Sequence, residues 1–140
     1  LQPYRLEDAR VGVLVLNSTA GTARVVVERL RGEGLPVGLL KLRMFRPFPV
    51  EELSQTLEGL DALAVLDRAE GFSGAGGPLF VDVCAALCGK KRIPQVVNYV
   101  YGLGGRDVVP QDIETVFRQL LALARGEISL PRLNYLGVRE

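Results

Sequence analysis

The stretch YVYGLGGRD, at residues 99–107, is a run of aromatic and β-branched residues that stops at three glycines and an Arg-Asp pair. A glycine lowers stability by roughly 0.5–1 kcal/mol relative to alanine in regular structure. We therefore expect that this loop needs its three glycines for its backbone, either for a positive φ or for a close approach by another group. Three other strand-like runs also end in loops of unusual composition, at residues 17–21, 46–49 and 67–77. If the strands are parallel, all four loops lie along one edge of the sheet, which we call the rim.

Four apolar runs alternate with four helical patterns along the chain. Residues 11–16 (VGVLVL) and 61–66 (DALAVL) are almost wholly apolar, which is typical of strands buried on both faces of a sheet. Residues 37–42 end in alternating charges and are expected nearer the edge, and residues 95–101 form the fourth strand. These β-then-α units predict an α/β fold of three layers, α/β/α, with a mainly parallel sheet in the strand order 2-1-3-4.

Each expected helix begins at a residue that favours a helix start. Ser18 or Thr19 can cap the first helix with a side-chain oxygen. Pro49, Pro78 and Pro110 each stand where the first residue of a helix is expected, a position that tolerates proline because its missing N–H has no partner there. Apolar residues recur at helical spacing after each start, which predicts one buried stripe per helix.

The composition limits the domain count, the partners and the compartment. A chain of 140 residues predicts a single domain over 1–140, with an irregular lead-in (1–10), an α/β core (11–126) and an irregular tail (127–140). The net charge is +1 with both signs interspersed, so neither nucleic acid nor a membrane surface is an expected partner. No apolar stretch approaches the roughly 20 residues of a membrane span, and no signal-peptide pattern is present, so a cytoplasmic location is expected. A first residue of Leu1 is consistent with an excised fragment.

Cys84 and Cys88 are the only cysteines, and the chain has no histidine. A zinc site or an iron–sulfur cluster needs about four ligands, so metal binding by this chain alone is not expected. The two cysteines are interpreted as small buried apolar residues on one helical face. Without histidine, Ser-His and Cys-His nucleophiles are excluded, while carboxylate or lysine chemistry remains open.

Each rim segment allows more than one interpretation. The turn at residues 17–22 could hold a phosphate at a helix N-terminus, although most such folds carry a comparable turn. The glycines at 102–105 resemble a dinucleotide fingerprint only loosely, because they follow the last strand rather than the first. The sequence RPFP at 46–49 fits either a recognition surface or a stiff connection. The charged residues Asp67, Arg68, Arg106 and Asp107 could form an ion-pair network between neighbouring loops.

Several segments taken together resemble the alpha subunit of the 2-oxoacid:ferredoxin oxidoreductases. The resemblance covers nearly the whole chain, and it rests on these motifs occurring in this order. The matching segments are PYRLEDA (3–9), STAGTA (18–23), LRGEG (30–34), VGLLK (37–41), RMFRPFP (43–49), VLDR (65–68) and GLGGRD (102–107).

The resemblance implies a fold like the C-terminal domain of transketolase. It also implies an enzyme, such as pyruvate:ferredoxin oxidoreductase, that decarboxylates a 2-oxoacid on thiamine diphosphate with Mg. Electrons then leave through iron–sulfur clusters to ferredoxin, and the acyl group passes to CoA. In that family other domains build the thiamine site, so we expect this chain to be a structural and docking domain, catalytically incomplete alone, within an oligomeric enzyme whose other domains and subunits are its partners.

The rim is the expected interface or ligand surface, while no catalytic or metal-binding residue is expected. Aromatic and arginine side chains in its loops, such as Phe48, are of the types enriched at interfaces and predict an exposed apolar patch. Tyr101 is expected to belong to that patch. The rim residues are Asn17, Ser18, Thr19, Arg46, Phe48, Asp67, Arg68, Gly102, Gly104, Gly105, Arg106 and Asp107.

Two alternatives remain open. One is a small-molecule module that binds a phosphate, a nucleotide or CoA in the crevice between the first and third strands. The other is the equivalent domain of a transketolase or a 2-oxoacid dehydrogenase. The motifs RPFP and GLGGRD favour the ferredoxin-linked family over this second alternative.

Overall fold

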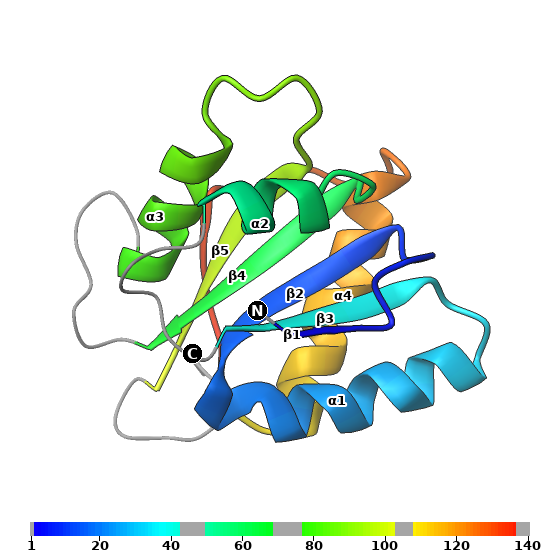
Figure 1. Ribbon diagram of the computed structural model, residues 1–140. Coiled ribbons are helices and arrows are strands. Elements are labelled where there is room, and N and C mark those ends of the chain that lie inside the picture. Colours follow the sequence, from blue (N-terminus) through cyan, green and yellow to red (C-terminus); the bar gives the residue numbers. More distant parts are fainter. Residues whose placement is uncertain (1, 43–49, 69–76, 103–107, 137–140) are drawn as a thin grey trace.

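A computed structural model describes residues 2–42, 50–68, 77–102 and 108–136, except the side chains of Asn17 and Ser18. Its strands form one six-stranded sheet in the order β1-β3-β2-β4-β5-β6 (Figure 1). The strands are β1 (Gln2–Tyr4), β2 (Val11–Leu16), β3 (Val37–Leu42), β4 (Ala62–Arg68), β5 (Gln95–Tyr101) and β6 (Leu133–Tyr135). The helices are α1 (Asn17–Gly32), α2 (Val50–Thr56), α3 (Pro78–Leu87) and α4 (Pro110–Ala124).

The four central strands confirm the predicted order. β3, β2, β4 and β5 lie side by side and parallel, with Val13 of β2 opposite both Leu39 of β3 and Ala64 of β4. Because β2 and β4 are neighbours whose following helices cover opposite faces, the direction of winding reverses between them. The carboxyl ends of these two strands therefore open the crevice that the sequence predicted.

Both ends of the chain add a strand that the sequence analysis had as irregular. β1 pairs antiparallel with β3, and β6 pairs parallel with β5. Each is three residues long, too short for an alternating pattern to show in the sequence. As a result β3 is not at the edge, and four of its first five residues are buried.

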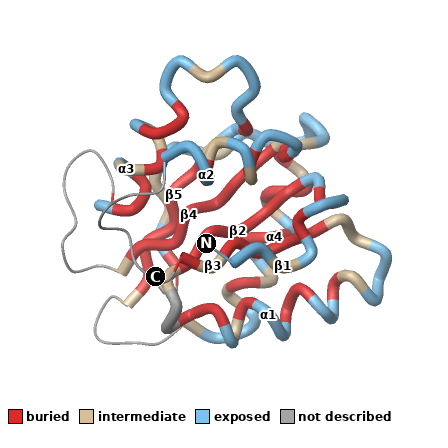
Figure 2. Tube along the Cα trace, viewed as in Figure 1, coloured by how far each residue is buried: buried red, intermediate tan, exposed pale blue. Residues whose placement is uncertain are grey.

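Two helices cover each face of the sheet, as the three-layer prediction required (Figure 1). One apolar cluster joins α1 and α4 to the sheet, with Phe117 and Tyr99 among its fully buried members. The other joins α2 and α3 to the opposite face, around Leu53 and Leu79. Figure 2 shows the strands buried along the middle and the outer helix faces exposed. The chain thus has a core of its own on both sides of the sheet.

The predicted helix starts are confirmed at two prolines, whereas the predicted cap of α1 is wrong. Pro78 and Pro110 are the first residues of α3 and α4, while Pro49 lies outside the described residues. The predicted cap by Ser18 or Thr19 is wrong, because α1 begins at Asn17 directly after β2 and Leu16 holds the N-cap position. The strand runs straight into the helix, so Thr19 lies inside the first turn.

The two cysteines are not both buried, which corrects the interpretation above. Cys84 is half-buried on α3, whereas Cys88 is exposed. The reason is that α3 ends at Leu87, so Cys88 stands on the turn that leaves the helix rather than on its apolar face. Within the ranges given above, no helix has the length and apolar character that crossing a bilayer requires.

Candidate functional site

The rim lies at the carboxyl ends of β2, β4 and β5. Thr19 stands in the first turn of α1, Asp67 and Arg68 end β4, and Gly102 directly follows β5. Asn17 and Ser18 open α1, and nothing is described of their side chains. The remaining predicted rim residues lie outside the described part of the chain: Arg46, Phe48, Gly104, Gly105, Arg106 and Asp107.

Thr19, Tyr101 and Arg68 meet at this edge although they come from three different elements. The Thr19 hydroxyl and the Tyr101 hydroxyl share a hydrogen bond of 2.8 Å, and both residues are buried. The Arg68 guanidinium lies over the Tyr101 ring, 5.3 Å from its centroid, which is within range of a cation–π contact. Tyr101, expected in an exposed patch, is only 3% exposed and instead ties α1 to the ends of β4 and β5.

The Asp67 carboxylate occupies the N-terminus of α3. Its Oδ1 accepts a hydrogen bond from the backbone N–H of Leu79 at 2.9 Å, and its Oδ2 accepts one from that of Phe80 at 3.0 Å. These are the second and third residues of α3, whose N–H groups have no partner within the helix. A carboxylate there also interacts favourably with the positive end of the helix dipole. Asp67, which lies in β4, therefore caps α3 in place of a side chain at the helix's own N-cap position, which is Gly77.

Asn98, in the middle of β5, completes this buried arrangement. Its side-chain N–H₂ donates to the Val65 carbonyl and to Asp67 Oδ2, each at 3.0 Å, and its Oδ1 accepts from the Gly77 N–H at 2.8 Å. Asn98 is fully buried, so these bonds replace the water that its amide loses on folding. We call Asp67, Asn98 and Gly77 the α3 anchor.

Gly77 belongs to the α3 anchor for a steric reason. A Cβ atom added at this position would lie 2.2 Å from the Asp67 Cγ, far inside van der Waals contact. Its φ of −70° is one that any residue adopts, so the requirement for glycine comes from the carboxylate and not from the backbone. Any other residue here would push Asp67 away from α3.

The pKa of Asp67 is raised, chiefly because burial penalises the charged carboxylate. The hydrogen bonds from Leu79, Phe80 and Asn98 act in the opposite direction, since they favour the carboxylate form. Among the described residues, its two oxygens bond to backbone and side-chain amides rather than to a cation. The predicted pairing with Arg106 or Asp107 involves residues outside the described part, and it stays a prediction.

The sequence analysis found Asp67 but not its partner Asn98. The signal was an asparagine within QVVNYVY, where a fully buried strand would be apolar, and a lone polar residue there indicates a buried hydrogen-bonding role. The described polar groups of Thr19, Asp67 and Asn98 all face the protein's own elements. These bonds tie the ends of β4 and β5 to the starts of α1 and α3.

Comparisons with known proteins agree with this architecture. Residues 9–113 match the family model described as pyruvate:ferredoxin oxidoreductase core domain II. The chain is 44% identical over 140 residues to the pyruvate synthase subunit PorA of Thermotoga maritima, covering 100% of this chain and 35% of that protein. It is 42% identical over 111 residues to the ketoisovalerate oxidoreductase subunit VorA of Pyrococcus furiosus, covering 79% of this chain and 28% of that protein.

A solved structure shows the fold independently. A split-gene transketolase, described as an inactive β4 tetramer, superposes with a TM-score of 0.66 at 19% identity, covering 89% of this chain and 42% of that one. The expected likeness to a transketolase domain is thereby confirmed for the fold. The chain spans about a third of the length of the PorA relative. Together with the resemblance in the motifs, the family match shows that this chain belongs to the pyruvate:ferredoxin oxidoreductase core domain II family.

Proposed function

We propose that this chain is a structural and docking domain of the alpha subunit of a 2-oxoacid:ferredoxin oxidoreductase. The observation that carries the proposal is that the described polar groups at the rim form hydrogen bonds with one another and with neighbouring elements. Asp67 and Asn98 anchor α3, and Thr19 is bonded to Tyr101. Strand and helix ends that are tied together in this way suit docking against a partner, and the family to which the chain belongs supplies the enzyme.

The substrate in this proposal is pyruvate. The relatives called pyruvate synthase support it, while the ketoisovalerate oxidoreductase subunit supports a branched 2-oxoacid as the alternative. The complete enzyme would decarboxylate the 2-oxoacid and form acyl-CoA, with electrons passing to ferredoxin, as an oligomer in the cytoplasm. This domain would support that reaction by docking against the other domains and subunits, which hold the cofactors.

Thiamine diphosphate, Mg, iron–sulfur clusters and CoA belong to the other parts of the enzyme in this proposal. The residues of this chain do not fit an iron–sulfur cluster, since the sequence has no histidine and only two cysteines. Among the residues that the structure describes, no three His, Cys, Asp or Glu side chains gather where they could hold a metal ion. No catalytic step is therefore assigned to this chain.

Calorimetry and turnover assays on the purified chain test the proposal. We expect no binding of thiamine diphosphate with Mg at micromolar concentrations and no pyruvate-dependent reduction of an electron acceptor in the presence of CoA. Adding the polypeptide that supplies the rest of the subunit, together with the partner subunits, should restore turnover. Micromolar thiamine diphosphate binding by the chain alone would contradict the proposal, and so would full turnover by the other polypeptides in the absence of this chain.

A further inference from the structure

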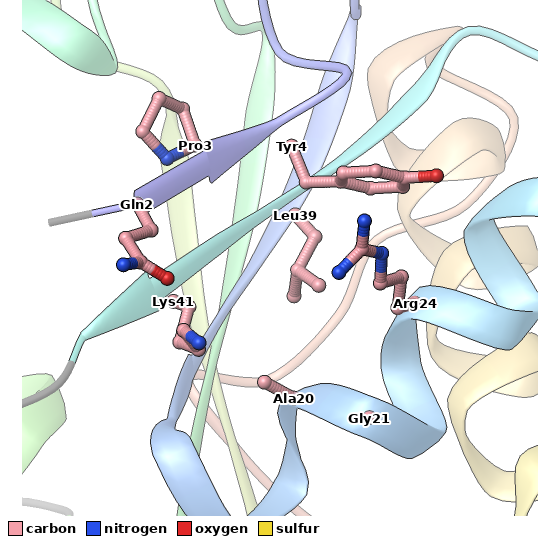
Figure 3. Close-up of a pocket in the computed structure, with 8 residues that line it drawn as sticks. All are labelled: Gln2, Pro3, Tyr4, Ala20, Gly21, Arg24, Leu39 and Lys41. Atoms are coloured by element: carbon pink, nitrogen blue, oxygen red, sulfur yellow. The ribbon is translucent and has the colours of Figure 1, made fainter.

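A cleft of about 500 Å³ opens between β1, β3 and α1, within the roughly 300–1,000 Å³ typical of binding sites. Figure 3 shows it with Leu39 between two polar walls, and with Ala20 and Gly21 of α1 below. One wall is formed by the Tyr4 ring and the Arg24 guanidinium, and the other by the Gln2 amide and the Lys41 ammonium (Figure 3). The sequence analysis did not single out any of these polar residues.

The two cations of the cleft have no carboxylate partner among the described residues. Arg24 lies over the Tyr4 ring with its Cζ 4.5 Å from the centroid, a contact that fixes the guanidinium without neutralising it. Neither Arg24 nor Lys41 forms an ion pair with another described residue. Other cations of the protein do pair with a described carboxylate, among them Arg5, Arg10, Arg29, Arg31, Arg118 and Lys90.

The cleft continues the rim past β3. Ala20 and Gly21 follow Thr19 in α1, and Lys41, opposite Gln2, is the last residue but one of β3, so this end of the cleft stands at the carboxyl edge of the sheet. Its outer boundary is β1, the end strand of the sheet, whose backbone pairs with β3 on one side only among the described strands. An unpaired strand edge beside a cleft is a place where an extended segment can lie.

Two positive charges that share a cleft repel each other and favour an anion between them. The chain spans about a third of the PorA relative, so roughly two thirds of that subunit lies outside the matching region and is available as a partner. A guanidinium held by an aromatic ring is well suited to bind a carboxylate with two hydrogen bonds.

We propose that this cleft receives an Asp or Glu side chain from the rest of the subunit, with its carboxylate between Arg24 and Lys41. The inference rests on the proposed function, and it extends the docking surface from the rim to a charged pocket with a stated partner chemistry. The half-buried Tyr4 ring covers the apolar part of the incoming segment. Ala20 and Gly21 leave the room that it occupies, since nothing lies within 4 Å of a Cβ built on Gly21.

The test measures the dissociation constant between this chain and the polypeptide that supplies the rest of its subunit. The double variant Arg24→Glu/Lys41→Glu reverses both charges of the cleft. Its control, Lys91→Glu/Arg92→Glu, makes the same change of charge at two exposed residues that precede β5, at the opposite edge of the sheet. We expect the dissociation constant to rise at least tenfold in the cleft variant and to stay within twofold in the control.

A neutral variant, Arg24→Gln/Lys41→Gln, keeps the test valid if charge reversal disturbs folding, which circular dichroism monitors. It should weaken assembly and reduce the dependence of assembly on salt concentration. Assembly of both cleft variants within twofold of the wild type would overturn the inference while leaving the proposed function standing. Failure of the wild-type chain to assemble would instead contradict the proposed function and this inference with it.

A small anion is the competing occupant, and pyrophosphate is the probe that separates the two. The inference predicts that the lone wild-type chain binds pyrophosphate no tighter than millimolar in a calorimetric titration. Micromolar binding that the cleft variant abolishes, with assembly unaffected, would make this a small-molecule site and overturn the inference.

Discussion

At the scale of single residues, the α3 anchor places a carboxylate where a helix start needs an acceptor. Asp67 and Asn98 come from neighbouring strands, and the Asn98 amide bridges the β4 backbone, the Asp67 carboxylate and the start of α3. Each polar atom of the pair is bonded, so removal of one partner would leave a buried group unpaired. Such a group typically costs about 1–3 kcal/mol.

The Gly77→Ala substitution tests this arrangement. Its methyl group would overlap the Asp67 carboxylate, so we expect the free energy of unfolding to fall by at least about 1–3 kcal/mol. The control is Gly21→Ala, inside α1 with nothing within 4 Å, where greater helix propensity should raise the free energy of unfolding by up to about 1 kcal/mol. Urea unfolding of both variants decides the matter, and equal stabilities would argue against the anchor.

At the scale of elements, the apolar runs predicted the four central strands because burial on both faces leaves a continuous pattern, and the pattern of doubly wound folds predicted their order. The same reasoning missed β1 and β6, whose three residues each show no pattern. It also assigned Thr19 to a helix cap, whereas its hydroxyl is bonded to Tyr101, a partner 82 positions away in the sequence. Local spacing carries no information about such a contact, and the same holds for the Asp67 contact with α3.

The contact between β5 and α4 predicts a pH dependence. The Tyr99 hydroxyl donates to Gln119 Oε1 across the two elements, and burial raises the pKa of Tyr99 to about 12. Because an unfolded tyrosine ionises near pH 10, the folded state keeps the Tyr99 proton between about pH 10 and pH 12, while the unfolded state loses it. The contribution of Tyr99 to stability is therefore fully present below pH 10 and is lost as the pH rises toward 12.

Urea unfolding at a series of pH values checks this expectation against Tyr99→Phe, which cannot ionise at this position. The wild type should be the more stable protein at pH 8, since the variant leaves Gln119 without its donor. Its advantage should shrink as the pH rises from 10 to 12. A difference that stays constant over that interval would mean that Tyr99 is not protected by burial.

At the scale of the whole molecule, the proposed docking surface consists of the rim and the cleft beside it. The sequence predicted that β3, β2, β4 and β5 are parallel, which the structure confirms, so their carboxyl ends share one edge of the sheet. It could not show which side chains turn inward. Tyr101 proved to be buried, whereas Arg24 and Lys41, which looked like ordinary surface charges of α1 and β3, border a cleft.

The most direct measurement of docking at the rim is the affinity of Phe48→Asp for the thiamine-binding portion of the enzyme, with its urea unfolding measured alongside. The matched control is Ile93→Asp, which puts the same charge at an exposed apolar residue just before β5. Docking through the rim predicts that both variants keep their free energy of unfolding within about 1 kcal/mol of the wild type and that only Phe48→Asp loses assembly. Undisturbed assembly of Phe48→Asp, or unfolding of that variant on its own, would contradict it.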